Sequence, residues 1–239
     1  MTQFQCYAKL SEYLKKVEIE TGRSIKFRSA ADLGAPGMTF GITPDPSCIL
    51  IICKEGTDLG DPKHEHSIAH EATHGYLVYK LGYSTFRTKR KPTKNETNYV
   101  NILFSMIDDI VVNKIIQEEG FLPFSPRYLS QVEIETKEAH KASYKLYDGL
   151  PHDLLFKDRY MVLRYIVAWG LVRYCDLEPY ARRKIHKYLK AFQRSYSKQF
   201  TMADQIREVI LQHDIFSAHG HSKTVEAVAR LWHLDDLVG

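Results

Sequence analysis

Two histidines and a glutamate occur together in the sequence His70-Glu71-Ala72-Thr73-His74, which has the pattern HExxH. Residues i and i+4 of an α-helix lie one above the other, so both imidazoles could bind a single ion. Zinc held by two histidines needs a third protein ligand and keeps one position for water. Glu71 lies about 100° around the helix from His70, so we expect it to accept a proton from that water.

A third ligand is expected from a second, very apolar helix at about residues 98–119. Its polar exceptions form one narrow stripe with four-residue spacing: Asn101, Ser105, Asp109 and Asn113. A carboxylate among apolar side chains would be costly to ionise without a cation nearby. We predict Asp109 as the metal ligand in preference to its neighbour Asp108, because Asn113 then lies one turn further. Asn113 could there hydrogen-bond the outer nitrogen of a ligand histidine.

The sequence HEATH followed by a helix with DxxxN resembles the gluzincin branch of the zincin metallopeptidases, over roughly residues 47–117. In that branch a glutamate binds zinc, and an aspartate one turn later orients a histidine. The pattern is also similar to small cytosolic zincin-like domains with Asp as the ligand and Asn one turn later. The shorter Asp109 would require a closer approach of the two helices, and Asn113 would orient a histidine less strongly than a carboxylate. The metzincin extension is excluded, because Leu77 and Lys80 stand where it needs glycine and histidine.

The hydrophobic periodicity predicts an α+β fold with a small strand-containing N-terminal lobe and a mainly helical C-terminal part. The resemblance implies that this fold is zincin-like. We expect one domain over residues 1–239, with the metal site in residues 1–125 and the helical part in 126–239. Strands are predicted at 24–28 and 47–54, and a loop at 33–41. Helices are predicted at 3–21, 64–81, 98–119, 129–147, 154–174, 179–197, 202–216 and 222–237.

The bulk composition is that of an ordinary globular protein, with 44% hydrophobic and 26% charged residues among 239. The formal net charge of +4 is mild, and it argues against a nucleic-acid partner. Four cysteines without regular spacing favour a reducing compartment. We expect neither a secretory signal nor a membrane-spanning segment, and therefore a cytoplasmic protein. The sequence does not indicate the oligomeric state.

Other histidines, tyrosines and cations are weaker candidates. His66 lies four residues before His70, and we interpret it as a solvated residue at the start of the helix. His219 and His221 are interpreted as part of a polar loop. The basic segment 87–94 is interpreted as a solvated connection. A donor to the developing oxyanion is also expected, with four candidates in the helical half: His140, His152, Tyr160 and Tyr165.

These residues predict a zinc metallopeptidase acting on a peptide or protein substrate. One alternative is a non-catalytic zincin-like protein that binds metal or a partner and has a regulatory role. Another is a zinc amidohydrolase acting on a non-peptide amide. The intact Glu71 argues against the regulatory alternative, because a site without catalysis has no need of its base.

Overall fold

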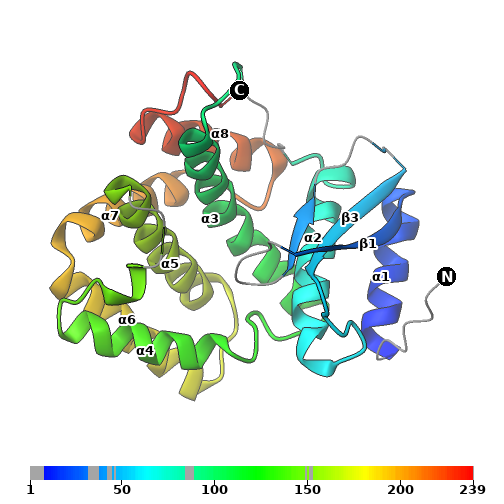
Figure 1. Cartoon of the computed structure of the whole chain (residues 1–239), viewed down its shortest axis with the longest axis horizontal. Helices are drawn as coiled ribbons and strands as arrows, with labels where there is room; N and C mark the ends of the chain where they lie inside the picture. The colour runs from blue at the N-terminus through cyan, green and yellow to red at the C-terminus, as the bar shows by residue number, and fades with distance from the viewer. Residues whose placement is uncertain are drawn as a thin grey trace. The chain divides into compact units, whose positions relative to one another are not determined.

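The computed structural model describes three strands and eight α-helices, which gives an α+β fold as predicted (Figure 1). A small N-terminal sheet is followed by a mainly helical part. The chain forms two compact units, one of residues 1–82 and 115–126 and the other of residues 83–114 and 127–239. The residues described are 8–31, 38–41, 45, 47–83, 89–148, 150 and 153–238.

The first unit is built on a mixed sheet with the strand order β1-β3-β2. Strand β1 (Ser24–Ala30) runs parallel to the central β3 (Cys48–Lys54), and β2 (Met38–Gly41) runs antiparallel to it. Strand β2 lies where the sequence predicts a loop, so that prediction is wrong for these four residues. Pairing with β3 satisfies the backbone groups on that side of β2, and Met38 is buried opposite Cys53.

Helices α1 (Ala8–Thr21) and α2 (Glu65–Tyr79) pack on each other, and α2 packs against β2 and β3. A glycine in α2 permits this close packing. A Cβ atom at Gly75 would lie 2.6 Å from Cγ2 of Ile49 in β3. Between the helices, the Tyr13 hydroxyl donates to Oγ1 of Thr73 (2.6 Å), which itself donates to the Ala69 carbonyl. Helix α2 is therefore fixed to both the sheet and α1.

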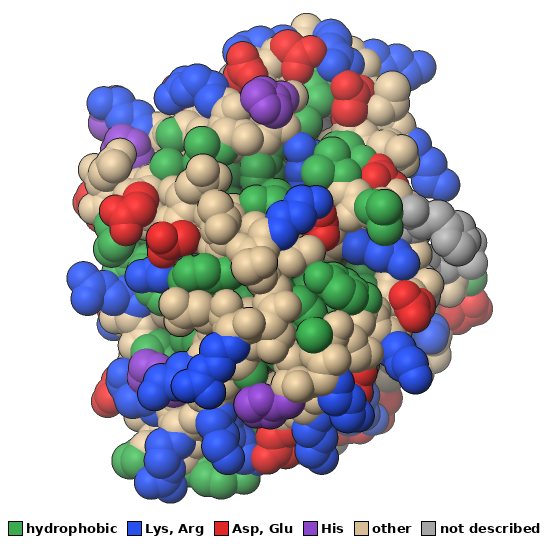
Figure 2. Space-filling view, turned by 90° about the vertical axis from the view of Figure 1, so that its left-hand side faces the viewer, with side chains coloured by type: hydrophobic (Ala, Val, Ile, Leu, Met, Phe, Trp, Pro, Cys, Tyr) green, Lys and Arg blue, Asp and Glu red, His purple; other side chains and the backbone are tan. Residues whose placement is uncertain are grey.

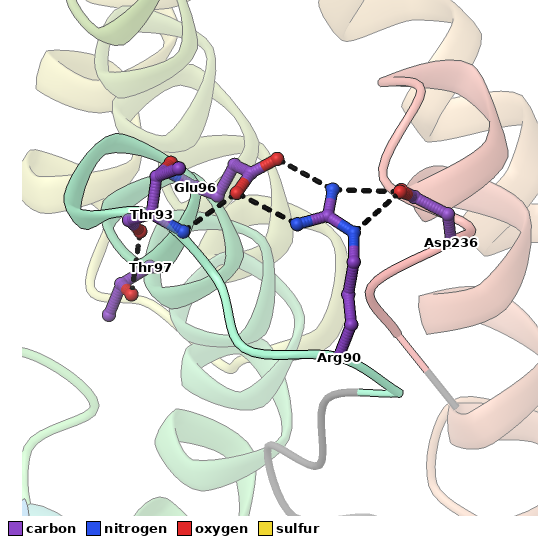
Figure 3. Close-up of polar contacts among 5 residues, drawn as sticks. All are labelled: Arg90, Thr93, Glu96, Thr97 and Asp236. Atoms are coloured by element: carbon purple, nitrogen blue, oxygen red, sulfur yellow. Dashed lines mark hydrogen bonds and ion pairs between the residues drawn. The ribbon is translucent and has the colours of Figure 1, made fainter.

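Helix α3 (Lys94–Glu118) begins four residues earlier than the sequence predicts. Its first turn is a capping box, in which the Glu96 carboxylate accepts from the Thr93 backbone N–H (2.7 Å) and the Glu96 N–H donates to Oγ1 of Thr93 (3.3 Å) (Figure 3). The Arg90 guanidinium bonds both Glu96 and Asp236, which ties the start of α3 to the C-terminal segment. The basic segment 87–94 is thus more than a solvated connection, at least over its described residues.

The second unit continues through five more helices and one short 3-10 turn. They are α4 (Tyr128–His140), the turn η2 (Lys145–Tyr147), α5 (Leu154–Tyr174), α6 (Pro179–Ser195), α7 (Ser197–Gln212) and α8 (Ala218–Leu231). Helix α4 packs on α6, α5 packs on α6 and α7, and α7 packs on α8. The predicted helix 129–147 ends early, at His140, with Ala142 in the left-handed region (φ 49°).

The last residues of the chain pack into the second unit. Trp232, Leu234, Leu237 and Val238 are buried, and the Lys89 N–H donates to the Leu237 carbonyl (2.9 Å). No helix within the described ranges is long and apolar enough to cross a membrane.

Candidate metal centre

Three imidazoles follow one another along a single face of α2. The ring centroids of His66 and His70 are 5.7 Å apart, and those of His70 and His74 are 4.9 Å apart. The Nε2 atoms of His70 and His74 approach to 3.2 Å, and all three side chains are half-buried. The two histidines of the motif therefore direct the same nitrogen at one point, as the helical spacing predicts.

Small and apolar residues of α2 hold this face in place. Ile68, Ala69 and Ala72 are buried, and Thr73 and Gly75 make the contacts with α1 and β3 described above. The motif is consequently part of a packed helix and not of a fraying surface turn.

Glu71 is buried, with 8% of its surface exposed. It lies near the Cys53 thiol of β3, where burial chiefly raises the pKa of the thiol and the Glu71 charge raises it further. The second residue of HExxH is thus largely shielded from solvent.

His70, His74 and Asp109 form a group that could hold a metal ion, since their ligand atoms all lie within 4.8 Å of one another. Two imidazole nitrogens and a carboxylate oxygen are a donor set that suits zinc. Ligand nitrogens at about 2.0–2.1 Å from a tetrahedral zinc ion are about 3.3 Å apart. The observed 3.2 Å between the Nε2 atoms agrees with that spacing, so the residues fit the ion.

Asp108, the other carboxylate considered as a third ligand, bonds a different partner. Its Oδ1 lies 2.6 Å from Nε2 of His221, a fully buried histidine whose ring packs on Tyr83 with centroids 4.8 Å apart. The prediction that His221 lies in a polar loop is wrong, because the residue is in the first turn of α8. Oγ of Ser217 caps that turn by accepting from the Gly220 N–H (3.1 Å).

A tight contact explains why this turn contains glycine. A Cβ atom at Gly220 would lie 2.0 Å from the Asp214 carbonyl oxygen. Ser217, a residue type preferred at helix N-caps, was a signal in the sequence that could have placed His221 on a helix.

The polar stripe of α3 runs from solvent into the protein. Asn101 and Ser105 are exposed, Asp109 is half-buried, and Asn113 is 5% exposed. The stripe is therefore not a solvent-facing surface along its whole length. The orienting role of Asn113 stays a prediction.

The candidates for an oxyanion donor have different environments. Tyr165 is a core residue that packs on Phe192, with ring centroids 4.9 Å apart. Tyr160 is half-buried beside Phe156, and His140 is exposed at the end of α4. His152 lies outside the described residues.

Comparisons with known proteins gave no match to this chain among protein-family models, curated proteins or solved structures.

Proposed function

We propose that this protein is a zinc-dependent metallopeptidase with His70, His74 and Asp109 as its metal ligands. The observation that carries the proposal is the 3.2 Å approach of the two Nε2 atoms within a group that also contains a carboxylate. Three protein ligands leave one position for water, which is the pattern of catalytic and not structural zinc sites.

The general base in this proposal is Glu71. The bound ion supplies a Lewis acid that would polarise the scissile carbonyl and make water acidic enough to deprotonate near neutral pH. Glu71 accepts the proton of the attacking water and transfers it to the leaving amine. Its burial keeps bulk water from competing for that proton.

The residues around the site support an enzyme over a regulatory metal site. A site that only binds metal needs its ligands and their orientation, whereas this helix also keeps a buried glutamate beside them. Burying a carboxylate has a free-energy cost that packing alone does not explain. A peptide is the substrate proposed, because the gluzincin-like motifs resemble those of peptidases.

The test combines metal analysis with a peptide-cleavage assay on the full chain. Wild-type protein should contain one zinc ion per chain and should generate new N-termini in a mixture of peptides, detected by mass spectrometry. Glu71→Gln should keep the zinc but lose about 10²–10⁴ in rate, since glutamine cannot accept the proton. His70→Ala should lose the metal as well.

Glu65→Gln is the matched control, because it makes the same change in the first turn of the same helix. It should retain both zinc and cleavage. Unchanged turnover in Glu71→Gln would remove Glu71 from the role of base. A wild-type protein that binds zinc but cleaves no peptide would contradict the peptidase proposal, and one that takes up no zinc would contradict the metal site.

A further inference from the structure

Helix α6 carries six Lys and Arg residues among its 17 residues. Its sequence, PYARRKIHKYLKAFQRS, contains no Asp or Glu. Its cations are Arg182, Arg183, Lys184, Lys187, Lys190 and Arg194. Lys and Arg side chains gather in the lower part of the face shown in Figure 2, on the side where Figure 1 labels α4 and α6.

Four of these cations lie on one line. Arg183, Lys187, Lys190 and Arg194 are all exposed. Their spacing of four, three and four residues places them within an arc of about 60°, over about 16 Å of helix length. We call these four residues the α6 cationic stripe. Neighbours at this spacing are about 5–6 Å apart between Cβ atoms, so the stripe is an evenly spaced row of positive charge.

The stripe is neutralised only in part by the protein. Lys184 chiefly lowers the pKa of the Glu133 carboxyl, and the charges of Lys137 and of Lys187, a stripe residue, lower it further. Within the described parts of the chain, none of its four residues has a carboxylate at ion-pair distance. The two other cations of α6 do have partners. Lys184 forms an ion pair with Glu133 (2.5 Å), and Arg182 donates to the Val172 carbonyl (3.2 Å). The charges turned toward the neighbouring helices are therefore satisfied, and those of the stripe face solvent.

The opposite side of α6 is entirely occupied by packing. Ile185, Tyr188, Leu189 and Phe192 are buried in the second unit. No large aliphatic side chain of α6 remains to enter a lipid bilayer, as a membrane-surface helix requires. A row of cations without exposed aliphatic residues instead fits a partner recognised by regularly repeated negative charge. The exposed Tyr180 ring lies at one end of the same face, with Nζ of Lys184 4.2 Å from its centroid.

We propose that the α6 cationic stripe binds the phosphate backbone of a nucleic acid. The formal net charge of +4 for the whole chain conceals this feature, because it averages a concentrated row of cations with carboxylates elsewhere. Contacts from this row are to phosphates and carry no base readout, so binding is independent of sequence. The stripe does not depend on the proposed metal site.

The experiment measures binding of the full chain to a labelled random-sequence DNA of about 20 nucleotides, as a single strand and as a duplex, by fluorescence anisotropy. Salt is varied from about 50 to 200 mM. Four phosphate contacts predict that log K falls with log salt with a slope of about −3.6 for the duplex. The double variant Lys187→Gln/Lys190→Gln should weaken binding and reduce the magnitude of this slope by about 1.8.

A charge-matched variant separates the stripe from net charge. Lys54→Gln/Lys223→Gln removes two exposed lysines from other elements and should leave the slope unchanged. Equal slopes in both double variants, or no binding by the wild type at the lowest salt, would overturn the proposal. Binding to vesicles rich in phosphatidylserine but not to DNA, lost in the α6 variant, would replace it with a membrane partner. Glutamine favours helix at exposed positions, so both variants should fold.

Discussion

Two adjacent carboxylates of α3 have different surroundings, and this difference can be tested residue by residue. Asp108 bonds the fully buried His221, whereas Asp109 belongs to the group that could hold a metal. Successive helical side chains point about 100° apart, so the two carboxylates cannot serve the same partner. The pair therefore divides into a structural carboxylate and a proposed ligand.

We expect Asp109→Ala to lose zinc and Asp108→Ala to keep it. The metal-free Asp108→Ala variant should lose more free energy of unfolding than metal-free Asp109→Ala. Its substitution leaves the buried His221 imidazole without its partner, at a cost of about 1–3 kcal/mol. Zinc per chain, measured after dialysis against a weak chelator, and urea unfolding of the metal-free proteins give the two readouts. Equal zinc retention in the two variants would show that Asp109 is not the third ligand.

The sequence was informative at the residues where spacing alone determines a contact. His70 and His74 share a face because four residues make about one helical turn. The partner of Asp108 could not be predicted, because His221 lies 113 residues away along the chain and reaches it only through the packing of α8. Long-range pairs of this kind leave no periodic signal.

At the scale of elements, the first turn of α3 depends on one carboxylate. Glu96 accepts from the Arg90 side chain, from the Thr93 N–H and from the Thr93 side chain, and these bonds lower its pKa to about 2. Because the pKa of Glu96 is lowered in the folded protein, its bonds stabilise the folded state fully at pH values above the ordinary pKa of about 4.5. The stabilisation is lost as the pH falls from there toward about 2.

An NMR titration of the Glu96 carboxyl should therefore show a midpoint near pH 2. Arg90→Gln should raise this midpoint toward the ordinary value, because the Arg90 side chain makes the largest contribution. Lys91→Gln removes a neighbouring exposed cation and should leave the midpoint low. A midpoint at the ordinary glutamate value in the wild type would show that the capping box and its Arg90 bond are not formed.

Most long elements could be predicted. The errors occur where a local cap determines the start of a helix or where pairing with a neighbour determines that a strand forms. The helix predicted at 154–174 has the same bounds as α5. The starts of α3, α7 and α8 were predicted four or five residues too late. Thr93 with Glu96 and Ser217 with Gly220 begin two of these helices through side-chain bonds, whereas the apolar pattern becomes clear only a turn later. Strand β2 was missed because its pairing with β3 is not visible in four residues.

At the scale of the whole molecule, averages predict the class of the protein but not where its charges act. The composition correctly indicates a folded chain with a packed core, and 44% hydrophobic residues are enough to build both compact units. The same averaging conceals the α6 cationic stripe, since a net charge carries no information on clustering. Periodicity along one helix recovers the stripe once the buried side of α6 is known.

Metal binding should be visible in the stability of the whole chain, because an ion that binds only the folded state stabilises it by mass action. At a free zinc concentration about 100 times the dissociation constant, this stabilisation is about 2.7 kcal/mol. For a chain of 239 residues, that corresponds to a rise in Tm of about 5–10 °C. Differential scanning calorimetry with added zinc and with a chelator measures the difference in Tm.

His74→Ala should show the same Tm in both conditions, whereas Glu71→Gln should respond to zinc as the wild type does. A wild-type Tm that is insensitive to both zinc and chelator would contradict the metal site, whatever the catalytic assay shows.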